Sequence, residues 1–113
     1  MLKLAISNKI IEAIRASAIK YLCIRRIGVF GSYARGENDD TSDIDILYDY
    51  DTSCDDSTDQ ILAFMDDFED MMKPLAVDFI CFNCVIKKDD DFRKATLNEV
   101  IWIYDAQTST ESV

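Results

Sequence analysis

The feature of this 113-residue sequence that most constrains its fold is the segment from Ile27 to Asp51, IGVFGSYARGENDDTSDIDILYDYD. An apolar run over residues 26–30 predicts a strand that leads directly into Gly31 and Ser32. One helical turn, a polar loop and a second apolar run follow. The segment therefore predicts a strand, a tight turn with a short helix, and a second strand.

The second predicted strand carries two aspartates, Asp43 and Asp45, two positions apart. Side chains alternate between the two faces of a strand, so both carboxylates point the same way. Neighbouring carboxylates repel each other, and a fold accommodates them mainly when a cation lies between them. Hard ions that prefer oxygen ligands, such as Mg²⁺, suit such a pair. The spacing therefore indicates a metal site.

The turn before this strand supplies a different chemistry. Gly31 has no side chain, so a ligand can approach its backbone closely. Ser32 is expected to cap the short helix, and free N–H groups at a helix start attract phosphate. A phosphate-binding turn beside a metal-binding carboxylate pair is what nucleotide chemistry requires.

This pattern resembles the signature of the polymerase-beta-type nucleotidyltransferases, and within them it is most similar to the minimal nucleotidyltransferases. The resemblance is carried by GSYARG over residues 31–36, five intervening residues and SDIDI over residues 42–46. It extends more weakly from the first helix to about Asp105. It implies an α/β (α+β) fold of the polymerase-beta-like kind, with helices packed on a small mixed sheet of three to four strands.

The resemblance also implies the functional residues. The family has a third carboxylate on a strand that follows one helix, and Asp78, inside the apolar run over residues 76–80, takes that place. Two Mg²⁺ ions, for which Mn²⁺ would substitute, are then expected on the catalytic residues Asp43, Asp45 and Asp78. ATP is the expected substrate, and its binding falls to Gly31, Ser32, Arg35, Gly36 and Ser42.

Two of these residues have alternative interpretations. Asp78 would be costly to bury unless it is paired or bound to a metal, but it could also face water at a sheet edge. Arg35 could pair with phosphate, or it could instead fix an acidic loop.

The activity implied by the resemblance is transfer of AMP from ATP to a hydroxyl, such as a tyrosine, on a partner protein. Some minimal nucleotidyltransferases are antitoxins encoded beside a helical toxin of the HEPN class, which would be both partner and acceptor. Two alternatives remain at this point. The protein could be an antitoxin that neutralises its partner by docking alone, or it could modify a small molecule, as aminoglycoside-modifying relatives do, with a separate helical subunit.

Length, charge and hydropathy bear on the number of domains, on nucleic-acid binding and on the location of the protein. The length predicts one domain over residues 1–105, followed by a disordered tail over residues 106–113. The net charge of −10 disfavours direct binding to nucleic acid, because phosphates would be repelled. No apolar run is long enough to span a membrane and no signal peptide is apparent, so a cytoplasmic protein is expected. Homo-oligomers and hetero-oligomers are both open.

The four cysteines do not predict a metal or redox site. Cys81 and Cys84 have the spacing of half a zinc site or of a redox pair. Cys23 and Cys54 are isolated in the sequence, and there is no histidine to complete four ligands. Cys81 ends an apolar strand, where a free thiol behaves as a small hydrophobe.

Hydrophobic periodicity and turn residues predict the remaining elements. In chain order, these are a helix over residues 6–23, strands over 25–30 and 43–50, a helix from Ser57 or Asp59 to just before Pro74, a strand over 75–82 and a helix over 87–98. Residues 99–105 are β-prone but are assigned to no element. Asp49 and Asp51 are expected to face solvent. The apolar stripes of the two longer helices are Ile6, Ile10, Ile14, Ala18 and Leu22, and Ile61, Phe64, Met65, Phe68, Met71 and Met72.

Overall fold

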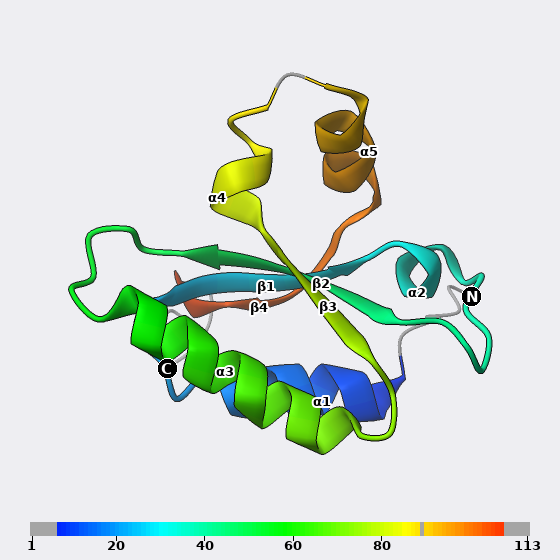
Figure 1. Ribbon diagram of the computed structural model, residues 1–113, viewed down its shortest axis with the longest axis horizontal. Coiled ribbons are helices and arrows are strands. Elements are labelled where there is room, and N and C mark those ends of the chain that lie inside the picture. Colours follow the sequence, from blue (N-terminus) through cyan, green and yellow to red (C-terminus); the bar gives the residue numbers. More distant parts are fainter. Residues whose placement is uncertain (1–6, 89, 108–113) are drawn as a thin grey trace.

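The computed structural model describes residues 7–88 and 90–107, which form a four-stranded mixed sheet with helices on both faces (Figure 1). The strand order is β3 (Val77–Cys81), β2 (Ile44–Tyr50), β1 (Ile24–Phe30) and β4 (Ile101–Asp105). β1 is antiparallel to both β2 and β4, whereas β2 and β3 are parallel. The predicted mixed sheet is confirmed, and the segment left unassigned in the sequence forms its fourth strand.

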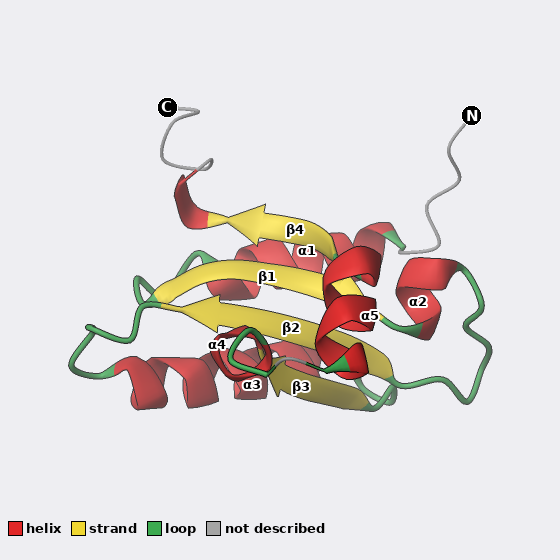
Figure 2. Cartoon of the chain, turned by 90° about the horizontal axis from the view of Figure 1, so that it is seen from above, coloured by secondary structure: helices red, strands yellow, loops and turns green. Residues whose placement is uncertain are grey.

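The helices divide between the two faces of the sheet. The two long helices, α1 (Asn8–Ala18) and α3 (Ser57–Met72), cover one face, and the shorter helices α4 (Phe82–Val85) and α5 (Asp91–Glu99) lie over the other (Figures 1 and 2). The four-residue helix α2 (Ser32–Arg35) follows β1 at one end of the sheet. No helix in the described part of the chain is long and apolar enough to cross a membrane.

The main core lies between the sheet and the two long helices. α1 begins after Ser7, whose side chain accepts a hydrogen bond from the Ile10 N–H. The rings of Phe64 and Phe68 on α3 both meet Phe79 of β3 edge-on. The buried members of the two predicted stripes are Ile10, Ile14, Ala18, Ile61, Phe64, Phe68 and Met72.

Two positions differ from the predicted stripes. α1 ends at Ala18 rather than Cys23, so Leu22 lies beyond the helix and is 91% exposed. Met71 is 40% exposed, because its neighbour Met72 takes the core-facing position. Ile6 lies outside the described residues, as do residues 108–113 of the predicted tail.

The α4–α5 face has a smaller apolar cluster and a partly buried ion pair. The prediction of a solvated Asp49 is wrong, because the register of β1 and β2 places it beside Arg26. Arg26 Nε donates to the Asp49 carboxylate at 2.9 Å, and Asp49 is buried. The guanidinium group of Arg26 also stacks over Trp102 and Phe82, 4.0 and 4.9 Å from the two ring centres.

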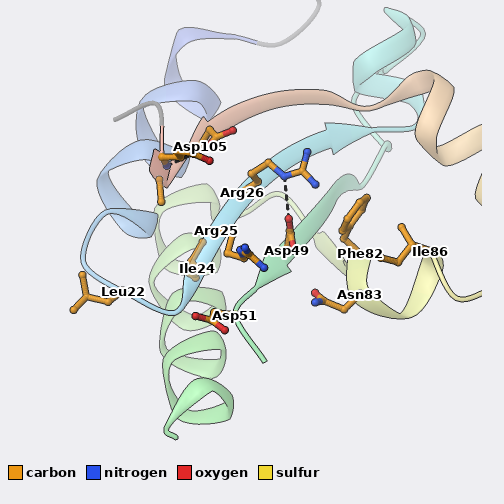
Figure 3. A pocket seen from close by; sticks show the side chains of 12 residues that line it. Leu22, Ile24, Arg25, Arg26, Asp49, Asp51, Phe82, Asn83, Ile86 and Asp105 are labelled. Atoms are coloured by element: carbon orange, nitrogen blue, oxygen red, sulfur yellow. Dashed lines mark hydrogen bonds and ion pairs between the residues drawn. The ribbon is translucent and has the colours of Figure 1, made fainter. Parts of the chain in front are cut away.

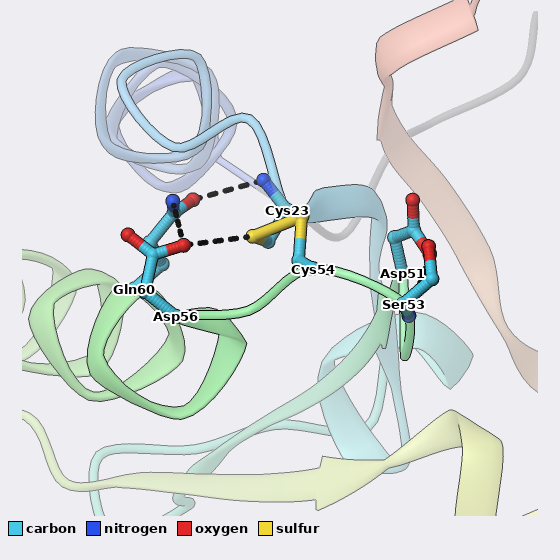
Figure 4. Close-up of a disulfide and its surroundings, with 6 residues drawn as sticks. All are labelled: Cys23, Asp51, Ser53, Cys54, Asp56 and Gln60. Carbon is cyan, nitrogen blue, oxygen red and sulfur yellow. Dashed lines mark hydrogen bonds between the residues drawn. A yellow bond between two sulfur atoms is a disulfide. The ribbon is translucent and has the colours of Figure 1, made fainter.

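Cys23 and Cys54, isolated in the sequence, form a disulfide with a Cα–Cα distance of 5.8 Å (Figure 4). The bond joins the segment before β1 to the loop that precedes α3. Beside it, the Cys23 N–H donates to the side-chain oxygen of Gln60 at 2.9 Å. Cys81 and Cys84 are free thiols.

Candidate active site

A cavity of about 480 Å³ opens where β1 ends and β2 and β3 begin. The turn after β1, the starts of β2 and β3, and α5 all contribute to its wall. Its lining residues are Phe30, Gly31, Ser32, Arg35, Asp43, Asp45, Asp78, Phe92, Ala95, Thr96 and Glu99. The cavity therefore brings together the three predicted carboxylates and three of the five predicted nucleotide-binding residues.

The parallel pairing of β2 and β3 positions the carboxylates. Asp45 and Asp78 are direct partners in the register of these two strands, although they are far apart in the sequence. Asp43 immediately precedes β2 and is exposed, and Asp45 is partly buried. β3 is an edge strand, so Asp78 is exposed to solvent as well as adjacent to Asp45. The two interpretations of Asp78 are thus compatible.

The three carboxylates lie close enough for Asp43 and Asp78 to affect the pKa of Asp45. Burial raises the pKa of Asp45, the negative charges of Asp78 and Asp43 raise it further, and the nearby Arg35 opposes this rise. A bound cation would relieve this repulsion, and carboxylate oxygens are the ligands that Mg²⁺ prefers. The donor chemistry therefore fits a divalent ion. Among the described residues, however, no three acidic, cysteine or histidine side chains converge closely enough to form a complete metal site.

Gly31 allows the turn to lie against Asp45. Its backbone angles, φ 73° and ψ −148°, belong to a region that is essentially restricted to glycine. A Cβ atom at this position would collide with the Asp45 carboxylate. Gly31 is also the residue that caps α2, and Ser32 is the first residue of the helix. The prediction that Ser32 is the cap is therefore wrong, but its side chain still lines the cavity.

Arg35 is held at the cavity wall by two acidic side chains. Its Nε donates to Glu37 at 2.7 Å, and its Nη1 donates to both carboxylate oxygens of Glu99 at 3.0 and 3.1 Å. The hydrogen bonds to Glu37 and then Glu99 raise the pKa of Arg35, which therefore stays charged. In this structure Arg35 fixes acidic groups, which is the second of its two predicted roles.

Gly36 and Ser42 do not line the cavity. Gly36 ends α2 in the left-handed conformation, with φ 76° and ψ 23°. The Ser42 hydroxyl accepts a hydrogen bond from the Asp39 N–H at 2.9 Å, which closes the loop between α2 and β2. Both residues shape the segment that carries the site.

The contribution of α5 was not predicted. A helix over residues 87–98 was expected, but it was not assigned to the site, which Phe92, Ala95, Thr96 and Glu99 of α5 line. The available signal was Glu99 itself, an acid near the end of a helix, where the helix dipole disfavours negative charge.

A larger cavity, of about 740 Å³, lies at the opposite end of β1 (Figure 3). Several of its polar side chains already have partners. Arg26 pairs with Asp49, and the side-chain amide of Asn83 bonds both the N–H and the carbonyl of Tyr50 at 3.2 and 3.1 Å. We therefore assign the candidate active site to the smaller cavity, where the carboxylates gather.

Comparisons with known proteins show the family and the fold of this chain. The family model described as nucleotidyltransferase domain matches residues 8–103. Protein adenylyltransferase MntA of Thermococcus cleftensis is 30% identical over 105 residues, which cover 91% of this chain and 98% of that protein. The structure of a minimal nucleotidyltransferase matches with a TM-score of 0.53 and 26% identity, covering 80% of this chain and 86% of the other. A toxin–antitoxin structure with AMP-PNP shares the fold, with a TM-score of 0.51, 20% identity and coverage of 92% and 77%.

Proposed function

This chain belongs to the nucleotidyltransferase domain family, and we propose that it is a protein adenylyltransferase that transfers AMP from ATP to a hydroxyl of a partner protein. One observation carries the proposal. The Gly31–Ser32 turn, with its glycine-only backbone, lies against Asp45 in a cavity that also contains Asp43 and Asp78. The groups proposed to bind phosphate and metal would then lie within reach of one nucleotide.

The carboxylates and the turn have different roles in this proposal. Asp43, Asp45 and Asp78 would hold Mg²⁺, or Mn²⁺ in its place. When bound, the metal would neutralise charge on the triphosphate and lower the pKa of the attacking hydroxyl. The backbone N–H groups of the turn and the Ser32 hydroxyl would bind the β- and γ-phosphates and orient the α-phosphate towards the carboxylates.

Apart from the metal and the two substrates, the reaction would need no group from outside the site. The acceptor oxygen forms a bond to the α-phosphorus, and the bond from that phosphorus to the leaving pyrophosphate breaks. The hydroxyl proton passes to the carboxylate of Asp78, whose exposed position on the edge strand leaves it open to an incoming acceptor. The products are an AMP ester of the acceptor and pyrophosphate.

A protein acceptor is supported by the relative MntA. It is a protein adenylyltransferase, and the match covers nearly all of its length. The toxin–antitoxin neighbour supports a toxin as the partner, and we propose a helical toxin of the HEPN class as both binding partner and acceptor. The open cavity between the carboxylates and α5 would admit a side chain from such a protein.

Binding of nucleotide with metal should raise the thermal stability of the protein. A ligand that binds only the folded state stabilises it by about 2.7 kcal/mol at a hundredfold excess over its Kd. We therefore expect ATP with Mg²⁺ or Mn²⁺ to raise the unfolding midpoint in differential scanning fluorimetry, and metal alone to raise it less. The Asp43→Asn/Asp45→Asn variant should lose the metal-dependent part of the shift. An equal shift in both proteins, or none in the wild type at millimolar ATP, would contradict the proposed site.

A further inference from the structure

Glu99 is the one described acidic residue that α5 contributes to the candidate active site. Its two carboxylate oxygens both accept from Arg35 Nη1, and its side chain is 29% exposed. Glu37 also pairs with Arg35, through Nε, but its side chain is 65% exposed and lies outside the cavity lining. Arg35 is therefore shared between one carboxylate inside the cavity and one outside it.

The position of Glu99 is electrostatically unfavourable apart from this pairing. Glu99 is the last residue of α5, where the helix dipole presents its negative end, and the last turn of the helix contains no basic residue. The charge of Glu99 also contributes to raising the pKa of Asp45 across the cavity. Among the described groups, Arg35 is the cation that compensates the Glu99 carboxylate.

A triphosphate in this cavity would offer Arg35 a stronger partner. Guanidinium groups bind phosphate through paired, charge-assisted hydrogen bonds. Arg35 shares the cavity wall with Gly31 and Ser32, where the proposed function places the β- and γ-phosphates. Nε of Arg35 already donates to Glu37 and Nη1 already donates to Glu99. A paired contact to phosphate uses two guanidinium nitrogens, so a phosphate that pairs with Nη1 and Nη2 competes with Glu99 for Nη1.

We propose that Glu99 sets the nucleotide affinity of this site by competing with the triphosphate for Arg35. Glu99 is a positioning residue in this scheme, because it acts through Arg35 and not on the reacting atoms. The inference rests on the proposed function, since it assumes that the triphosphate binds beside the Gly31–Ser32 turn. A bound triphosphate displaces the Glu99 carboxylate from Arg35.

The test compares two glutamates that contact the same arginine. Isothermal titration calorimetry with Mg²⁺ would measure the Kd of ATP and of inorganic tripolyphosphate. Glu99→Gln should tighten binding of both ligands about fivefold, because it removes a competing charge but keeps a side chain that still accepts from Arg35. Glu37→Gln should change either Kd less than about twofold, because Glu37 lies outside the cavity. Thermal unfolding of each variant would confirm that it is folded.

A double-mutant cycle assigns the effect to Arg35. In an Arg35→Ala background, Glu99→Gln should tighten binding by less than twofold, because no shared cation remains. Unchanged or weaker binding by Glu99→Gln in the wild-type background would overturn the inference and leave Glu99 as a residue that only holds α5 in place. If the wild type binds neither ATP nor tripolyphosphate, the proposed function fails as well, so the two failures are distinguishable.

Discussion

Replacing Asp43 and Asp45 together by asparagine is expected to lower the rate of AMP transfer at least about a hundredfold and to leave the fold intact. Both side chains line the cavity, so the double variant loses two of the three carboxylates that are proposed to hold the metal. The fold should tolerate the change, because the pKa of Asp45 is raised first by burial and then by the charges of Asp78 and Asp43, and an amide carries no charge to bury or repel. Pyrophosphate release measures the rate, and circular dichroism with thermal unfolding measures the fold.

Asp51→Asn provides a matched control for this variant. Asp51 belongs to the same aspartate-rich stretch, but its carboxylate accepts hydrogen bonds from Ser53 and lies at the other end of β2. Its replacement should leave the transfer rate within about twofold of the wild type. A double Asp43→Asn/Asp45→Asn variant that is folded and retains more than a tenth of the wild-type rate would show that these carboxylates do not carry the reaction.

Gly31→Ala is expected to reduce both stability and activity. The backbone conformation at this position costs a residue other than glycine roughly 1–3 kcal/mol. The added methyl group would also collide with the Asp45 carboxylate and displace a proposed metal ligand. We therefore expect a lower free energy of unfolding in urea titration, together with a loss of transfer activity of at least about tenfold, because small misplacements of reacting groups are costly.

Gly36→Ala separates the two effects of the Gly31 substitution. Gly36 also has a positive φ, 76°, but it lies in the ordinary left-handed region, where a residue other than glycine costs roughly 1–2 kcal/mol. It does not line the cavity, so its replacement should lower stability with little loss of rate per folded molecule. If Gly31→Ala and Gly36→Ala behaved alike, close contact between the turn and Asp45 would not be needed for activity.

Much of the fold could be predicted because its local signals agree with one another. Alternating and helical apolar patterns located β1, β2, β3 and α3 to within about two residues, whereas the predicted end of α1 was five residues too late. The strand–turn–strand spacing placed the glycine turn beside the Asp43–Asp45 pair. Asp78 stood out because an acid inside an apolar run needs an explanation. The structure gives one in the parallel register of β2 and β3.

The features that sequence reasoning missed depend on long-range contacts. The Arg26–Asp49 ion pair requires the register of β1 against β2, and the Cys23–Cys54 disulfide joins residues that are 31 positions apart. Likewise, α5 reaches the cavity because it lies with α4 over the second face of the sheet (Figure 2). Four-residue helices such as α4 have too few residues to show a period. The Arg35–Glu99 contact, 64 positions apart, was inaccessible for the same reason.

Transfer of labelled AMP to a protein tests the central proposal most directly. Purified protein would be incubated with Mg²⁺, α-labelled ATP and lysate from its source cells, with the Asp43→Asn/Asp45→Asn variant in parallel. We predict a discrete labelled protein that appears only with the wild type and that carries AMP on a hydroxyl, as identified by mass spectrometry. The absence of any labelled protein, while ATP survives and the wild type is folded and binds it, would contradict a protein-directed adenylyltransferase.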